Sequence, residues 1–195
     1  MNGFVIFVNK IKKRYKFSLS RIYEGKVKRL TIKRNHLGEY FIVMCIDREV
    51  EKYGKTHDGA SVGIDFGLKK YMTLSNGVEI DNPQLLKSDL GELRRKSRNL
   101  SKCAKGSNNS KRKRFELDRL YNDVSNKRCD FQWKLAHQLC RQYDNIFIED
   151  LNLTGMSRCW GRKMSDLAHG EFVLKLEYVA SKYGCTVHKL SLIHI

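Results

Sequence analysis

Two acidic residues, Asp65 and Glu149, each end a short run of strand-forming residues, and this pair limits the folds that the chain can adopt. Asp65 lies in Ser-Val-Gly-Ile-Asp-Phe-Gly-Leu-Lys (61–69), and Glu149 lies in Asn-Ile-Phe-Ile-Glu-Asp-Leu-Asn-Leu (145–153). Turn-forming or polar residues bound both runs, which is typical of buried strands. A carboxylate at the end of a buried strand is unfavourable unless a cation balances it. If the two strands are neighbours, the pair suits Mg²⁺, which prefers oxygen ligands, and two such ions about 4 Å apart commonly cut phosphodiesters.

The charge of the chain indicates a polyanionic partner. Its net charge is +17, from 38 Lys and Arg against 21 Asp and Glu, and a surplus of this size attracts nucleic acid or, as a second interpretation, an anionic membrane. The apolar run at residues 4–8 is shorter than the roughly 20 residues of a membrane span or the about 7–15 of a signal peptide. We therefore expect a cytoplasmic protein with no membrane partner. The six cysteines include no Cys-x₂₋₄-Cys pair, so we expect no zinc site in this chain.

The pattern of apolar and turn-forming residues predicts a small basic β-rich domain over residues 1–58 and a larger α/β domain over residues 59–195. In the first domain, strands at 27–34 and 39–48 flank the turn Asn35-His36-Leu37-Gly38. In the second, Asn76-Gly77 is a strong hairpin signal, Asp166 is the expected N-cap of a helix, and Gly184 is its expected end. The expected elements of the second domain are strands at 61–66, 70–75 and 78–80, helices at 84–104 and 111–143, a strand at 146–149, a helix at 167–183 and a strand at 185–190.

This order of elements predicts a ribonuclease H-like domain. The hairpin makes the first three strands antiparallel, and the helices then return the chain to strands that run parallel to the first. The fold class is therefore α/β, with a mixed sheet and a long helical hairpin inserted at about residues 84–143. Asp65 and Glu149 would lie on adjacent central strands of that sheet.

A basic stretch at residues 94–128 is the expected nucleic-acid contact. It holds 13 Lys and Arg against three acids, which is more than solubility requires, although a solvated helix face is the simpler alternative. Contacts from such a stretch go to phosphates and do not read sequence. The candidate nucleic-acid-binding residues of this stretch and of the polar loop at 154–165 are Arg94, Arg95, Lys96, Arg98, Lys111, Arg112, Lys113, Arg114, Arg128, Arg158, Arg162 and Lys163.

Two further polar residues near the acids fit a metal site less well. Asp150 follows Glu149 directly, and successive strand residues face opposite ways, so we interpret Asp150 as a loop or cap residue. His169 stands near the start of a helix and has only a weak case as a ligand.

The aromatic residues of the helical region have two interpretations. We expect Tyr121, Phe131 and Trp133 to be core residues rather than platforms for nucleic-acid bases. Trp160 lies between Arg158 and Arg162 in a polar loop, where stacking on a base is an open alternative.

The segments around the two acids resemble the nuclease motifs of a transposon-encoded family. Val62-Gly63-Ile64-Asp65-Phe66-Gly67-Leu68-Lys69 resembles the first RuvC motif of the TnpB (OrfB) proteins, and Ile148-Glu149-Asp150-Leu151-Asn152-Leu153-x-Gly155-Met156 resembles the second. Lys105-Gly106-Ser107-x₃-Lys111 and Asn126-x-Arg128-x-Asp130-Phe131 resemble the basic helical hairpin of the family. Residues 26–49 resemble the end of its wedge domain, so residues 1–58 would be a wedge remnant.

The resemblance implies RNA-guided cutting of DNA in which guide RNA and DNA are the partners. Asp65 and Glu149 would be catalytic ligands of a two-ion Mg²⁺ site. The family continues beyond the position of Leu190 into a Cys-x₂-Cys zinc ribbon and a third catalytic Asp, which this sequence lacks. We therefore expect a fragment, shortened at both ends, with an incomplete metal site and little activity.

Two alternatives to a nuclease remain open. The chain could be a non-catalytic nucleic-acid-binding remnant of this family, or a basic RNA-binding protein of another lineage whose acids are structural. The sequence does not indicate an oligomeric state.

Overall fold

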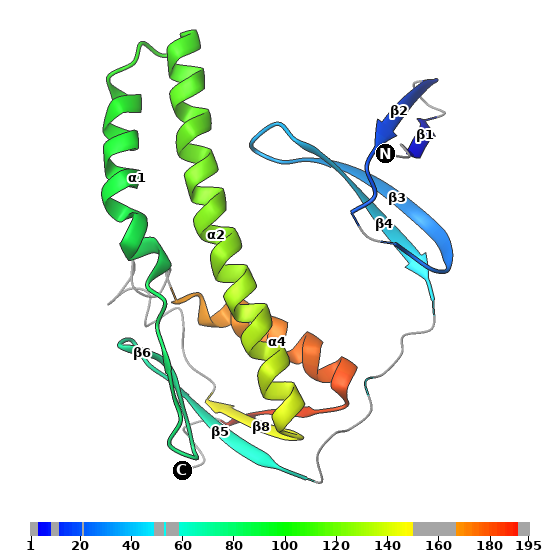
Figure 1. Cartoon of the computed structure of the whole chain (residues 1–195), viewed down its shortest axis with the longest axis vertical. Coiled ribbons are helices and arrows are strands. Elements are labelled where there is room, and N and C mark those ends of the chain that lie inside the picture. Colours follow the sequence, from blue (N-terminus) through cyan, green and yellow to red (C-terminus); the bar gives the residue numbers. More distant parts are fainter. Residues whose placement is uncertain are drawn as a thin grey trace. The chain divides into compact units, whose positions relative to one another are not determined.

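The chain divides into two compact units, Met1–Glu49 and Val50–Ile195 (Figure 1). The structure, a computed structural model, describes residues 4–8, 12–20, 22–48, 53, 59–149 and 167–190. None of the helices in these ranges is long and apolar enough to cross a membrane.

The first unit consists of two antiparallel ribbons. One ribbon pairs β1 (Phe4–Val8) with β2 (Lys13–Phe17), which the sequence analysis did not predict. The other pairs β3 (Lys26–Arg34) with β4 (Tyr40–Asp47), which confirms the two predicted strands. In the turn between β3 and β4, the Asn35 N–H donates to the Glu39 carbonyl at 2.9 Å.

The second unit is built on a mixed sheet, as predicted. Its strands lie in the order β7-β6-β5-β8-β9, and β6 is antiparallel to both of its neighbours. The strand β8 runs parallel to β5, and β9 runs parallel to β8. The bounds of these strands are β5 Ser61–Phe66, β6 Lys70–Leu74, β7 Glu79–Asp81, β8 Asn145–Glu149 and β9 Thr186–Leu190.

Three long helices are described in the second unit: α1 (Leu85–Ser101), α2 (Asn108–Gln142) and α4 (His169–Tyr183). The helix α2 begins three residues earlier than predicted, because the Ser107 side chain accepts a hydrogen bond from the Ser110 N–H and caps the helix at Asn108. The helix α4 begins two residues later than predicted, because Ala168 adopts a left-handed backbone with φ 47°. Its predicted cap, Asp166, lies outside the described residues. Gly184 ends α4 with φ 75°, as expected.

The core lies on one face of the sheet, which α2 and α4 cover (Figure 1). Burial alternates along β5, where Val62, Ile64 and Phe66 are buried and the residues between them are not. The strand β8 follows the same alternation. Because side chains of a strand alternate between the two faces, the unburied positions of both strands lie on the face opposite the helices.

A buried amide links the sheet to both covering helices. Gln132 of α2 is fully buried, and its Nε2 donates to the Tyr71 hydroxyl of β6 at 3.1 Å and to the carbonyl of Ala168 at 3.1 Å. Its Oε1 accepts a hydrogen bond from the Lys175 ammonium of α4 at 2.5 Å. Since these groups satisfy one another, their hydrogen bonds offset the desolvation penalty of burying them in the core.

The turn between β5 and β6 requires a glycine at position 67. A Cβ atom there would lie 2.9 Å from the Lys70 carbonyl oxygen, so Gly67→Ala forces the backbone to shift. We expect this substitution to lower the free energy of unfolding by about 1–3 kcal/mol, the range for overpacking. Gly91→Ala is the matched control, because a Cβ in α1 would meet no atom within 4 Å, and it should stabilise the helix by up to about 1 kcal/mol. Urea denaturation measures both, and equal effects would contradict the turn geometry.

Candidate active site

Asp65 and Glu149 line the same pocket on the open face of the sheet. The parallel pairing of β5 with β8 sets Ile64 opposite Ile148, so the two acids follow at neighbouring positions. Strands that are paired in this way lie about 4.8 Å apart, and residues in register point to the same face. Asp65 is exposed and Glu149 is half-buried, and their pocket has a volume of about 560 Å³. The structure therefore brings together the two acids that the sequence analysis selected.

Hydroxyl and apolar side chains complete the pocket. Thr73 lies opposite Asp65 in the antiparallel pairing of β5 with β6. The Ser75 hydroxyl accepts a hydrogen bond from the Gly63 N–H at 3.0 Å, which ties the end of β6 to β5. Phe147 and Leu190 form an apolar wall. None of these residues was selected from the sequence. The short turn at residues 67–69 could have indicated Thr73, because the length of the turn fixes which residue of β6 faces Asp65.

The donors in this pocket fit a hard divalent cation. Two carboxylates and nearby hydroxyl oxygens are the ligand type that Mg²⁺ and Ca²⁺ prefer. Within the described ranges, no group of three or more His, Cys, Asp or Glu side chains is placed to hold a metal ion. The pocket thus supplies two anionic ligands, and Asp150 lies outside the described residues.

His169 is a core residue on the helix-covered side of β5. Its ring lies 4.6 Å from the Phe66 ring and 5.2 Å from the Tyr71 ring, measured between centroids. The Tyr71 backbone is a polar neighbour of the ring, but neither ring nitrogen reaches hydrogen-bond geometry with a described residue. Burial lowers the pKa of His169 to about 4, so the ring is neutral at pH 7. It is not placed to be a ligand beside Asp65.

The predicted cations of α1 and α2 are mostly exposed. Arg94, Arg95 and Arg98 lie on α1, and Lys111, Arg112 and Arg114 lie in the first turns of α2. Two glutamates take part of this charge, because Glu92 contacts Lys96 at 3.4 Å and Glu116 contacts Lys113 at 3.2 Å. Partly exposed pairs of this kind contribute little to stability. The other predicted cations of the two helices are exposed and thus accessible to phosphates: Arg94, Arg95, Arg98, Lys111, Arg112 and Arg114.

Arg128 differs from the other predicted cations. Its side chain is only 19% exposed, and its guanidinium lies 3.9 Å from the Glu171 carboxylate of α4. It therefore takes part in the packing of α2 against α4. The remaining predicted cations, Arg158, Arg162 and Lys163, lie outside the described residues, as does Trp160.

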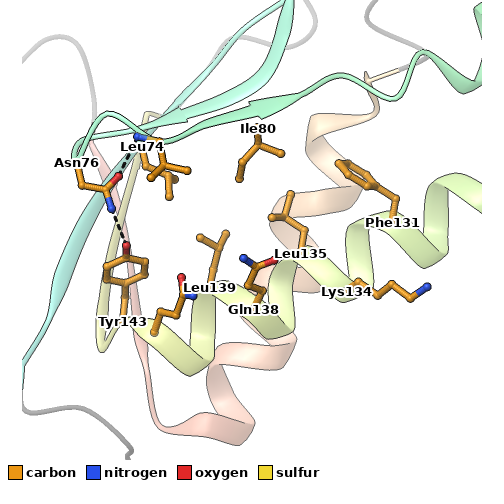
Figure 2. A pocket seen from close by; sticks show the side chains of 11 residues that line it. Leu74, Asn76, Ile80, Phe131, Lys134, Leu135, Gln138, Leu139 and Tyr143 are labelled. Atoms are coloured by element: carbon orange, nitrogen blue, oxygen red, sulfur yellow. Dashed lines mark hydrogen bonds between the residues drawn. The ribbon is translucent and has the colours of Figure 1, made fainter.

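A larger pocket of about 680 Å³ lies between the β6–β7 hairpin and α2 (Figure 2). Leu74 and Ile80 of the hairpin face Leu135 and Leu139 of α2 across it. At one end, the Asn76 amide donates to the Tyr143 hydroxyl at 2.9 Å. Among the described residues, no carboxylate lines this pocket, so we do not select it for metal chemistry.

The aromatic residues predicted as core differ in their environment. Phe131 and Trp133 are half-buried and pack against the core cluster. Tyr121 is 50% exposed, so the prediction that it is a core residue is wrong. It lies on the part of α2 that faces α1, where it lines a shallow hollow together with Leu90 and Leu93.

Sequence comparisons connect this chain to transposon proteins. The family model OrfB_IS605, described as "Probable transposase", matches residues 44–159. A "Putative RNA-guided DNA endonuclease" of Streptomyces pristinaespiralis is 34% identical over 158 residues, which cover 80% of this chain and 39% of the relative. "Putative RNA-guided DNA endonuclease InsQ" of Escherichia coli (strain K12) is 31% identical over 140 residues, which cover 71% and 34%. The chain thus spans less than half of the length of these relatives.

The fold of the chain is similar to that of part of a solved structure. The chain resembles a protein chain in the cryo-EM structure of the Cas12f1-sgRNA-target DNA complex with a TM-score of 0.52 and 17% sequence identity. The match covers 83% of this chain and 35% of that chain. At this identity the likeness concerns the fold alone.

The buried His169 predicts a pH dependence of stability. Its pKa is lowered from 6.5 to about 4 in the folded chain, so its contribution to stability is complete above pH 6.5 and is lost as the pH falls toward 4. This shift of the His169 pKa corresponds to a change of about 3 kcal/mol in the free energy of unfolding across this pH range. His169→Phe should weaken the pH dependence of the free energy of unfolding in this window, as measured by urea denaturation. His36→Gln, in an exposed turn, should leave it unchanged, and an unchanged dependence in His169→Phe would contradict the prediction.

The basic stretch predicts a strong dependence of nucleic-acid binding on salt. Replacing Lys111, Arg112, Lys113 and Arg114 with Gln should weaken binding and lower the slope of log K against log [salt] by about 0.7–0.9 for each phosphate that the variant no longer binds. Fluorescence anisotropy at several salt concentrations measures this slope.

The matched control removes four positive charges from side chains outside the basic stretch, each of which contacts a carboxylate: Lys28, Lys70, Lys134 and Lys189. It reduces the net charge equally and should change the slope less. Equal slopes in the two variants would show that only net charge matters and that residues 111–114 are a solvated helix face.

Proposed function

Because the chain belongs to the OrfB family of transposon proteins, we propose that it provides the catalytic core of an RNA-guided DNA endonuclease that hydrolyses phosphodiesters with Mg²⁺. The observation that carries this proposal is the position of Asp65 and Glu149 on neighbouring parallel strands, in one pocket on the open face of the sheet. The names of two relatives, which describe RNA-guided DNA endonucleases, agree with it.

In this proposal the second unit is a ribonuclease H-like domain of the RuvC type. The strand order β7-β6-β5-β8-β9, with an antiparallel hairpin on one side of β5 and parallel strands on the other, supports this assignment. The proposed nuclease domain spans residues 59–195, with the helical insertion at about 84–143, and residues 1–58 are the end of a wedge domain. The first unit, with its two basic ribbons, agrees with a nucleic-acid-binding role for that region.

Asp65 and Glu149 are the proposed catalytic residues and metal ligands. A bound Mg²⁺ pair would supply an activated water and would stabilise the leaving oxygen. The chain itself supplies two carboxylates on a rigid pair of strands, which keeps their spacing fixed. The hydrogen bond between Gly63 and the Ser75 hydroxyl holds the neighbouring strand end against this pair, so the floor of the pocket is preorganised.

The exposed cations of α1 and α2 are the proposed contacts for guide RNA and DNA. They lie on helices that project away from the sheet (Figure 1). Contacts of this kind hold the phosphate backbone, while base pairing between guide and target would select the sequence. The protein would therefore bind nucleic acid with little sequence preference of its own.

A non-catalytic nucleic-acid-binding role is the second candidate. It is favoured by the number of carboxylates, because the described part of the chain brings only two to the pocket. With fewer anionic ligands, a second metal ion would be held weakly. For this reason we expect this chain to cleave DNA slowly or not at all, even with Mg²⁺ and RNA.

Metal binding separates the two candidates. Mn²⁺, used as a spectroscopic substitute for Mg²⁺, should bind to the chain, and Asp65→Asn or Glu149→Gln should weaken that binding by at least about tenfold, since even changes outside the ligand set have effects of that size. Electron paramagnetic resonance of free Mn²⁺ measures the affinity. The same variants should bind RNA as well as the unmodified chain does, because their changes lie outside the basic helices.

Glu79→Gln is the matched control for these variants. Glu79 is a carboxylate of the same sheet, but it pairs with Lys70 at 3.1 Å and lies outside the pocket. If all three variants bind Mn²⁺ as the unmodified chain does, the pocket is not a metal site and the non-catalytic candidate stands.

A further inference from the structure

A row of aromatic rings crosses the seam between α2 and α4, and neither the carboxylate pocket nor the basic stretch at residues 94–128 includes it. Trp133 of α2 contacts Tyr178 of α4 edge to face, with centroids 5.7 Å apart. Along α2, Trp133 is followed by His137, which packs against Tyr183 of α4 at 5.7 Å. Tyr53 then stacks on Tyr183 at 4.8 Å. We refer to these five residues as the aromatic row.

The two outer rings of the row are open to solvent. Tyr178 is 53% exposed and Tyr53 is 54% exposed. Trp133 and His137 are half-buried, and Tyr183 is buried beneath them. The row is therefore anchored in the core on one side and presents ring surface on the other. Packing of α4 against α2 accounts for Tyr183, but it does not account for large rings that remain half in water.

Polar contacts hold the row in a fixed conformation. The Tyr183 hydroxyl accepts a hydrogen bond from Arg141 Nε at 3.1 Å and lies 3.2 Å from His137 Nδ1. The Tyr53 N–H donates to the Lys182 carbonyl at 2.9 Å, which fixes Tyr53 at the end of α4. A ligand that binds to these rings would thus meet a preorganised surface.

The charge around the row suits an anionic ligand. Lys182 Nζ lies 4.5 Å above the Tyr178 ring, and Arg141 borders Tyr183. Asp130, which is near Trp133 in sequence, pairs with Lys134 at 2.6 Å. Glu177, which directly precedes Tyr178, pairs with Lys189 at 2.7 Å. A hollow of about 640 Å³ runs along α2 beside the row. The described residues that line it include no acid and are Trp133, Lys134, His137, Gln138, Arg141 and Gln142.

From these observations we propose that the aromatic row binds unpaired nucleotides by base stacking, while Arg141 and Lys182 contact their phosphates. Stacked rings interleaved with cations are the recurring platform for single-stranded nucleic acid, and stacking is tolerant of sequence because every base has a flat face. The Gln138 and Gln142 amides can hydrogen-bond to base edges. A duplex does not fit this surface, because its base faces are already stacked.

The helix α2 connects this surface to the basic stretch. Lys111 to Arg114 and Trp133 lie about 30 Å apart on one straight element, at a rise of about 1.5 Å per residue. A strand held by the cations at one end of α2 can therefore reach the aromatic row at the other end. The proposal rests on the proposed function in one respect, namely that the chain binds nucleic acid at all.

Tryptophan fluorescence tests the stacking directly. The chain has two tryptophans, Trp133 and Trp160, so the Trp160→Phe variant of the full chain reports on Trp133 alone. We expect a single-stranded oligothymidylate of about 15 nucleotides to quench Trp133. An abasic oligomer with the same number of phosphates, and a duplex of the same sequence, should bind in an anisotropy assay without quenching. Equal quenching by the abasic oligomer, or none by oligothymidylate that is bound, would overturn the proposal.

A pair of variants tests the energetic contribution of the row. Tyr178→Leu keeps an apolar contact with Trp133 but removes the ring, so the affinity for oligothymidylate should fall about tenfold and the affinity for the abasic oligomer should not change. Leu174→Ala is the control, because Leu174 is an exposed residue of the same helix, α4, and lies outside both the row and the basic stretch. An equal loss of affinity in both variants, or a loss that is the same for both oligomers, would show that the row is a packing feature. If Tyr178→Leu proves unstable, Tyr53→Leu repeats the test, because Tyr53 lies outside the helices.

Failure of the proposed function gives a different result. If neither the oligothymidylate nor the abasic oligomer binds in the anisotropy assay, the chain does not bind nucleic acid, and both proposals fall. If both oligomers bind but Trp133 is not quenched, only the aromatic row is excluded.

Discussion

The parallel pairing of β5 with β8 joins two segments that are 84 residues apart, and the other elements of the larger unit depend on it. The register places Ile64 opposite Ile148 and thereby makes Asp65 and Glu149 neighbours. It also sets the position of β9, which continues the parallel arrangement on the far side of β8. Such a pairing requires a long crossover, and here α1 and α2 provide it. The pocket is therefore a consequence of how the crossover closes.

The same pairing separates the sheet into a structural face and a chemical face. Buried residues of β5 and β8 pack against α2 and α4, while the acids at the alternate positions remain beside solvent. Phe66 and Asp65 illustrate this division, because successive residues serve the core and the pocket respectively. The buried Gln132 cluster then fixes both helices to the sheet through hydrogen bonds to β6 and to the start of α4. Rigid support of this kind keeps the two carboxylates at a constant spacing.

The helix α2 has three roles along its length of 35 residues. Its first turns carry exposed cations, and its last third carries both the buried Gln132 and two residues of the aromatic row, Trp133 and His137. A single straight helix can combine these roles because its faces are independent, with one stripe buried and the opposite face free. In the proposed function, the helix would connect the region that holds the phosphate backbone to the domain that carries the carboxylates.

Local patterns determined most of the elements, and the two acids stood out in the sequence because each ends a strand-forming run. The Asn76-Gly77 hairpin, the glycine that ends α4 and the buried stripe of α2 all depend on neighbouring residues, so the sequence predicted them. The predicted starts of α2 and α4 differ from the observed ones by three and two residues, because a hydrogen bond to the Ser107 side chain and a left-handed Ala168 decide them. Only the tertiary structure decided that Arg128 and His169 are packed inside and that five aromatic residues form one row. These features arise from contacts between segments far apart in the chain, and no local pattern encodes the register that brings such segments together.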